Sequence, residues 1–92
     1  MKSSVLKNEI SKFPQSPGAY VFYGKNRKIL YIGKATNLKS RVQSYFRESG
    51  GTNRPIEAMI HQVSDIKTIE TESVLEALIL ESNLIKKYQP KY

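Results

Sequence analysis

The sequence contains no cysteine, which excludes a disulfide framework and any metal site built on thiolates. Its only histidine, His61, has no second metal ligand at helical spacing, so we expect it to be incidental. No apolar run approaches the length of a membrane span, and the N-terminal residues lack the apolar core of a secretion signal. These absences predict a cytoplasmic protein that does not enter a membrane.

Recognised nucleotide and hydrolase motifs are also missing. There is no Walker-type loop, dinucleotide fingerprint, nucleophile elbow or zinc pattern. The 92 residues can form one hydrophobic core and not two, so we expect a single domain spanning residues 1–92.

Charge is distributed unevenly along the chain. Residues 1–54 carry eleven Lys and Arg against two Glu, whereas residues 55–81 carry one Lys against six acids. The last eleven residues add three Lys, and the net charge is +7. A basic half of this kind predicts a polyanionic partner, with nucleic acid as the main candidate; charge that serves only solubility is the alternative.

Two short apolar runs in the basic half predict a β-hairpin. Residues 21–23 and 29–32 are rich in β-branched and aromatic side chains, and the polar residues 24–28 between them are typical of a turn. Tyr20 and Tyr31 would lie close together on neighbouring strands, with Gly33 and Lys34 directly after Tyr31. A short amphipathic segment, residues 5–13, precedes the hairpin, and we interpret it as structural.

Three further elements are expected after the hairpin. Thr36 or Asn37 can cap a helix over residues 38–47, which has an apolar stripe bordered by Arg41 and including Tyr45. A loop over residues 48–55 and a short helix over 56–63 follow. Residues 65–71 are expected to form a third strand. The Ser-x-x-Glu pattern at Ser73 predicts the start of a long helix that ends near residue 88.

Glu81 is the most informative acid in this last helix. Its neighbours three and four residues away are Ala77, Leu78, Leu84 and Ile85, all apolar. A carboxylate in the middle of a core-facing stripe is unfavourable unless a charge compensates it. A metal ion could do so, and a buried structural salt bridge is the alternative.

The tyrosines and cations of the basic half suggest chemistry on phosphate. A phenol, with a pKa of about 10, needs a nearby cation, or a metal-bound water as its partner, to act as a base near neutrality. Lys34 is placed by sequence to provide that cation, and Tyr45 could reach the same region. Arg41 presents a fork of donors suited to phosphate oxygens. Ordinary packing of the aromatic rings and a surface role for Arg41 are the alternatives.

These residues resemble the signature elements of the GIY-YIG nucleases. Gly18-Ala19-Tyr20 and Tyr31-Ile32-Gly33 are similar to the two signature tripeptides, and Lys34, Arg41 and Glu81 follow in the family's order. Residues 16–20, 32–35 and 80–92 are most similar to the UvrC-type members, whose domain belongs to the incision subunit of bacterial nucleotide excision repair. The resemblance covers essentially the whole chain, although Ala19 replaces a larger aliphatic residue and the asparagine usual after Pro-Lys-Tyr has no counterpart. Because the UvrC-type members are much longer, the resemblance implies that residues 1–92 are the N-terminal part of a longer protein.

The resemblance implies an α+β fold in which a small three-stranded antiparallel sheet is flanked by helices. It implies a DNA endonuclease that uses Mg²⁺ or Mn²⁺ held by Glu81, and incision on the 3′ side of a lesion together with UvrB. Arg41 would stabilise the transition-state charge, Tyr20 and Tyr31 with Lys34 would position or deprotonate the water, and Tyr45 would line the site. We expect DNA contacts from Gly33, Lys34, Lys39, Arg41 and Arg47. A free-standing nuclease with another role and a non-catalytic DNA-binding module are the alternatives.

Overall fold

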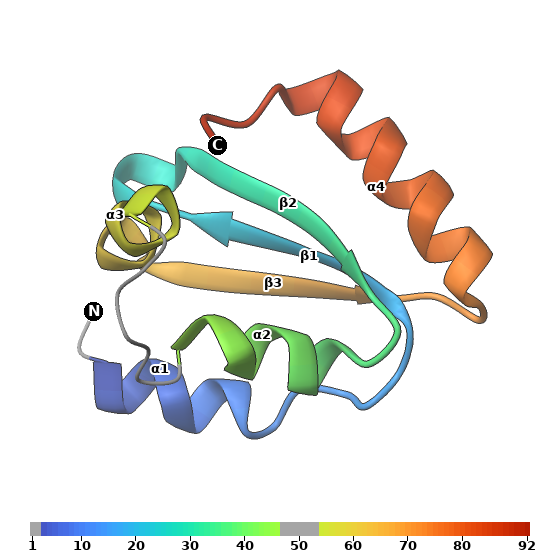
Figure 1. Ribbon diagram of the computed structural model, residues 1–92, viewed down its shortest axis with the longest axis horizontal. Coiled ribbons are helices and arrows are strands. Elements are labelled where there is room, and N and C mark those ends of the chain that lie inside the picture. Colours follow the sequence, from blue (N-terminus) through green and yellow to red (C-terminus); the bar gives the residue numbers. More distant parts are fainter. Residues whose placement is uncertain (1–2, 47–53) are drawn as a thin grey trace.

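The computed structural model describes residues 3–46 and 54–92, and in it a three-stranded antiparallel sheet lies between helices (Figure 1). In chain order the elements are α1 (Ser3–Ile10), β1 (Gly18–Tyr23), the 3-10 turn η1 (Lys25–Arg27), β2 (Ile29–Ala35), α2 (Leu38–Phe46), α3 (Arg54–Gln62), β3 (Asp65–Glu70) and α4 (Val74–Tyr88). The strand order is β2-β1-β3, so the first strand is central. The predicted α+β fold with its antiparallel sheet is confirmed.

The hairpin is closed by residues in the left-handed conformation. Asn26 and Arg27 both have positive φ angles, of 60° and 62°, as in the turns that suit the right-handed twist of paired strands. The Gly24 N–H donates to the Lys28 carbonyl at 2.7 Å. The register pairs Tyr20 with Gly33 and Phe22 with Tyr31, and it shifts after Phe22 so that Tyr23 pairs with Ile29. The hairpin thus places the two signature segments side by side.

Alternation along β1 divides its side chains between the two faces of the sheet, and both faces are buried. On one face, Tyr20 and Phe22 are buried in the cluster that includes Ile10 of α1 and Leu38 and Val42 of α2. Ala19 and Val21 alternate with them and are equally buried. They lie on the face that α4 crosses, where Ala77 is fully buried. Figure 1 shows α1 and α2 on one side of the sheet and α4 on the other.

The helix boundaries mostly agree with the sequence-based expectation. Asn37 caps α2, because its side-chain oxygen accepts from the Ser40 N–H at 3.0 Å. Ser73 caps α4 by accepting from the Glu76 N–H at 3.1 Å. The Glu76 carboxylate accepts from the Glu72 N–H, one residue before the expected partner of a capping box. The expected loop over 48–55 is wrong at its end, since α3 already begins at Arg54; residues 48–53 lie outside the described residues.

The C-terminal residues pair with the outer edge of β2. Gln89 ends α4 in the left-handed conformation with a φ of 46°. Beyond Pro90, the Lys91 N–H donates to the Ile29 carbonyl at 3.3 Å and the Tyr92 N–H donates to the Leu30 carbonyl at 2.8 Å. The Tyr92 hydroxyl accepts from Gln62 of α3 at 2.8 Å. These bonds hold residues 91–92 against the start of β2. The Gly33–Lys34 end of β2 is not covered by these residues.

Candidate active site

Three tyrosines from three elements form one cluster. Tyr20 comes from β1, Tyr31 from β2 and Tyr45 from α2. The ring centroids of Tyr20 lie 6.1 Å from Tyr31 and 5.9 Å from Tyr45, and those of Tyr31 and Tyr45 lie 6.1 Å apart. Phe22 packs beneath them, with its ring 5.2 Å from that of Tyr45 in an edge-on arrangement. The expected approach of Tyr20 to Tyr31 is therefore observed, and Tyr45 reaches the same place.

Hydrogen bonds connect this tyrosine cluster to Arg41. The hydroxyls of Tyr20 and Tyr45 lie 2.9 Å apart. Arg41 donates from Nη2 to the Tyr45 hydroxyl at 3.3 Å, and its guanidinium lies 5.0 Å from the Tyr45 ring centroid. The pair is possible because residues four apart on a helix lie on the same face. Arg41 itself is exposed, so its remaining donors can reach a ligand.

Burial keeps these phenols protonated. It raises the pKa of Tyr31 and of Tyr45 to about 12, and it also raises the pKa of Tyr20, whose side chain is only 1% exposed. The positive charge of Arg41 lowers the pKa of all three and so acts against burial. The cation that acts on the phenols is thus Arg41, a role that the sequence suggested for Lys34.

Gly33 is required for the close approach of β2 to Tyr20. A Cβ atom at this position would lie 2.3 Å from Cζ and from the hydroxyl oxygen of Tyr20. Real Cβ atoms do not approach other atoms so closely, so any other residue would displace the buried ring. The glycine of the second signature therefore sets the position of the tyrosine of the first.

Glu81 lies near this cluster but not in the core. Its negative charge contributes to the raised pKa of Tyr31, after the larger effects of burial and of Tyr45. The expectation of a core-facing stripe around Glu81 is wrong: Ala77 is buried, but Leu78 and Ile85 are 45% and 38% exposed. A sheet of three strands covers only one side of α4. Glu81 is partly buried at the boundary of that side, close enough for its charge to act on Tyr31.

A magnesium ion fits the oxygen donors at this position. Mg²⁺ is commonly held by one or two carboxylates, with water and phosphate oxygens completing its shell. Glu81 offers one carboxylate, and no group of three or more His, Asp or Glu able to hold a metal occurs among residues 3–46 and 54–92. The donor set therefore suits an ion shared with a substrate and not a closed structural metal site.

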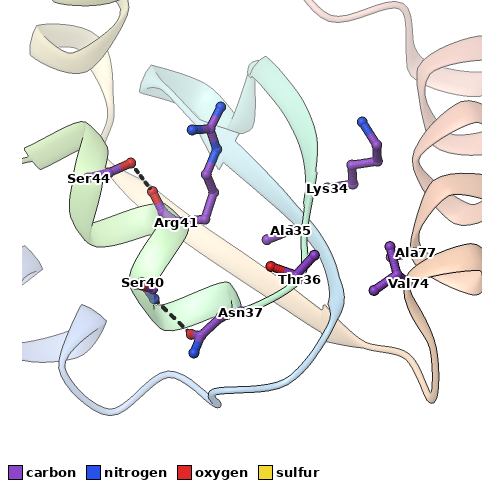
Figure 2. Close-up of a pocket in the computed structure, with 9 residues that line it drawn as sticks. All are labelled: Lys34, Ala35, Thr36, Asn37, Ser40, Arg41, Ser44, Val74 and Ala77. Atoms are coloured by element: carbon purple, nitrogen blue, oxygen red, sulfur yellow. Dashed lines mark hydrogen bonds between the residues drawn. The ribbon is translucent and has the colours of Figure 1, made fainter.

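A pocket of about 530 Å³ opens between β2, α2 and α4 (Figure 2). Lys34 and Arg41 approach it from opposite sides, and no carboxylate lines it. Hydroxyl, amide and small apolar side chains complete the lining: Ala35, Thr36, Asn37, Ser40, Ser44, Val74 and Ala77. A pocket with two cations and several hydrogen-bonding groups is suited to phosphate oxygens.

Two of the predicted DNA contacts, Lys39 and Arg47, are not among the described residues that line this pocket. Lys39 is partly exposed on α2, and Arg47 lies outside the described residues. The polar lining from Thr36, Ser40 and Ser44 was missed by sequence reasoning. Ser40 and Ser44 stand four residues apart and flank Arg41, and that spacing is the signal that could have revealed them.

In the part of the chain that the structure describes, no helix is long and apolar enough to cross a membrane.

Comparison with known proteins identifies relatives over the whole chain. The family described as the UvrC-like GIY-YIG domain matches residues 16–92. UvrABC system protein C from Christiangramia forsetii is 46% identical over 92 residues, which are 100% of this chain and 15% of the relative. The corresponding protein from Borrelia duttonii is 51% identical over 87 residues, 95% of this chain and 14% of the relative.

A solved domain structure superposes on the whole of this chain. The GIY-YIG N-terminal endonuclease domain of UvrC from Thermotoga maritima, bound to magnesium as its catalytic divalent cation, superposes with a TM-score of 0.84 at 37% identity. The match covers 100% of this chain and 98% of that domain. The chain therefore has the extent of the solved domain, but spans about a seventh of the length of these curated relatives.

Proposed function

This chain belongs to the family of UvrC-like GIY-YIG domains, and on that premise we propose that it is a divalent-metal-dependent endonuclease domain that hydrolyses a DNA phosphodiester. The observation that carries the proposal is the cluster of Tyr20, Tyr31, Tyr45 and Arg41 beside a pocket that contains cations and no acids, with Glu81 of α4 close enough for its charge to raise the pKa of Tyr31. A module that only bound DNA would not need a carboxylate there, since that carboxylate repels phosphate.

Arg41 and Lys34 bind the phosphodiester in this proposal. Both reach the pocket from opposite walls, and the planar guanidinium can contact two phosphate oxygens at once. Arg41 is held by its hydrogen bond to Tyr45, so its donors are already oriented when charge develops on the phosphate. Lys34 is exposed on the adjacent strand and adds a second positive charge.

The three phenols differ in what they can reach. Tyr20 is almost fully buried and hydrogen-bonds to Tyr45, so we assign it to positioning. Tyr31 is partly exposed and lies within reach of the charge of Glu81, which makes it the best candidate to orient the attacking water. With a pKa of about 12 its hydroxyl is protonated at neutral pH, so Tyr31 can act as a base only after giving up its own proton, and a cation held by Glu81 would favour that loss.

Glu81 is the residue that would hold the metal. When bound, Mg²⁺ supplies a Lewis acid that polarises the scissile phosphate. Glu81 would provide one carboxylate oxygen ligand, and its charge already acts on Tyr31. The chain's other groups then act around it: Arg41 and Lys34 hold the phosphate, and Tyr31 and Tyr45 line the approach of water.

We further propose a role in nucleotide excision repair. The relatives of which this chain spans about a seventh are proteins of the UvrABC system. By that relationship the domain would incise on the 3′ side of a lesion, in a complex with UvrB. The basic half of the chain, with eleven Lys and Arg against two Glu in residues 1–54, supports DNA as the substrate.

The proposal is tested by a nicking assay on damaged duplex DNA with UvrB, with Mg²⁺ or with EDTA. We expect nicking only with the metal, and we expect Tyr31→Phe and Arg41→Ala each to slow it by about a hundredfold or more. Tyr23→Phe is the matched control, because Tyr23 is on β1 but outside the tyrosine cluster. Nicking that persists in EDTA, or a Tyr31→Phe rate equal to that of Tyr23→Phe, would contradict the proposal.

A further inference from the structure

The outer side of α4 exposes a continuous apolar surface that the proposed nuclease function does not use. Leu75, Leu78, Ile79 and Ile85 are 64%, 45%, 53% and 38% exposed, although they belong to one helix of a small domain. Figure 1 shows α4 along the rim of the molecule, with none of the other described helices or strands outside it. An exposed apolar surface of this kind on a domain is typical of an interaction site.

The spacing of this surface is that of a helix that pairs with another helix. Leu75, Leu78, Ser82 and Ile85 follow one another at intervals of three, four and three residues, which is the repeat of the contact positions in a coiled coil. We call these four residues the α4 stripe. Glu81 is partly buried, whereas the four stripe residues are exposed, so the stripe is distinct from the proposed metal ligand.

We propose that the α4 stripe binds the α4 stripe of a second copy of this chain, with the two helices antiparallel. The stripe is self-complementary in that orientation. When two copies are aligned about Leu80, Leu75 of one lies opposite Ile85 of the other, because each is five residues from Leu80; Leu78 likewise lies opposite Ser82. Such an interface has a two-fold axis and is closed, so it produces a dimer and not a filament.

The charges at the two ends of α4 match this pairing. Glu72 and Glu76 lie at the N-terminal end, and together with Glu70 they line a pocket of about 750 Å³ that contains no cation. Lys86 and Lys87 lie in the last turn. In the antiparallel alignment, Lys86 of one copy lies opposite position 74 of the other, midway between Glu72 and Glu76. A parallel pairing would instead place like charges together, which disfavours it.

The size of the surface predicts a weak dimer. A helix of 15 residues is about 22 Å long, so the interface is at the small end for specific complexes. Dimer formation should therefore depend on protein concentration by mass action. The net charge of +7 opposes association over long distances, but it is screened within about 8 Å at physiological ionic strength.

The test is sedimentation equilibrium over about a hundredfold range of protein concentration. We expect a monomer–dimer equilibrium for the wild type. Leu75→Ser should weaken it at least about tenfold, because a packed contact at the end of the stripe is lost. The fold should be retained, since Leu75 is 64% exposed, and the far-UV circular dichroism of the variant verifies this.

Charge exchange tests the orientation without changing the apolar contacts. Glu72→Lys and Lys86→Glu should each weaken the dimer, and the double variant should restore it, because each exchanged charge again faces its opposite. Lys25→Glu, in the hairpin turn, is the control for a change in net charge and should leave the dimer unchanged. A wild type that is monomeric at every concentration overturns the proposal, and so does a double variant no stronger than the single ones.

Discussion

Tyr31 combines a raised pKa with partial exposure, and this makes its titration informative. The folded-state pKa is about 12, compared with about 10 in an unfolded chain. Below pH 10 both states are protonated, so Tyr31 makes a constant contribution to stability. Between pH 10 and pH 12 the unfolded chain loses its proton first, and the free energy of unfolding falls as the pH rises.

We therefore predict that Tyr31→Phe makes stability less dependent on pH in this window. Urea unfolding at several pH values between about 9 and 12 measures the slope, which should be shallower for Tyr31→Phe than for the wild type. Tyr23→Phe is the control, because Tyr23 lies outside the tyrosine cluster. Equal slopes for the wild type and Tyr31→Phe would mean that the environment of Tyr31 does not favour the neutral phenol.

Gly33→Ala should disturb the site through Tyr20. The added Cβ would meet the Tyr20 ring at 2.3 Å, and that ring is fixed in the core, so we expect a loss of about 1–3 kcal/mol in stability together with loss of nicking. Gly24→Ala is a milder control, because its Cβ would lie 3.2 Å from the flexible Leu30 side chain. Thermal unfolding and the near-UV circular dichroism of the tyrosines measure the two effects.

At the residue level, the sequence predicted which residues come together better than it predicted what each of them does. The order of tyrosines, Lys34, Arg41 and Glu81 indicated a site, and the structure brings Tyr20, Tyr31, Tyr45 and Arg41 together. Which cation acts on the phenols could not be predicted, because that depends on the direction of side chains after folding. The prediction that Glu81 lies in a core-facing stripe was also wrong. The apolar repeat of a helix does not show how much of the helix surface the sheet will cover.

Among the elements, α4 depends on its N-terminal cap for the position of Glu81. Ser73 accepts from the Glu76 N–H at 3.1 Å. We predict that Ser73→Ala lowers the free energy of unfolding by about 1 kcal/mol, because a backbone donor at the helix start loses its partner. Urea unfolding measures this loss. Ser82→Ala, in the exposed middle of the same helix, should be neutral or slightly stabilising, and a similar loss there would argue against the capping role.

The positions of the helices and strands were predicted better than any other feature of the structure. The bounds of α2, β3 and α4 were expected within a residue or two, and the hairpin was expected with each strand three residues too short at its outer end, since each element has a local signal in turn residues, caps or apolar spacing. The pairing of residues 91–92 with β2 was not expected, because it is a contact between segments distant in sequence with no local signature. The apolar outer side of α4 was likewise interpreted as core.

For the whole molecule, the separation of charge predicts how DNA affinity depends on salt. The logarithm of the association constant should fall linearly with the logarithm of salt concentration, because bound cations on the DNA are released. Lys34→Ala should reduce the slope by about one, since Lys34 lines the phosphate-binding pocket. Lys67→Ala should not, because Lys67 lies on β3, at the opposite edge of the sheet from β2. Fluorescence anisotropy with a labelled duplex measures both slopes.

The central claim is that one carboxylate, Glu81, holds the metal against the tyrosine cluster. The most direct measurement is the nicking rate of Glu81→Ala together with its DNA affinity, compared with Glu72→Ala just before the same helix. The account predicts that Glu81→Ala abolishes nicking in Mg²⁺ and leaves affinity largely intact, because the phosphate contacts come from β2 and α2, whereas Glu72→Ala nicks normally. Nicking by Glu81→Ala at the wild-type rate would contradict it.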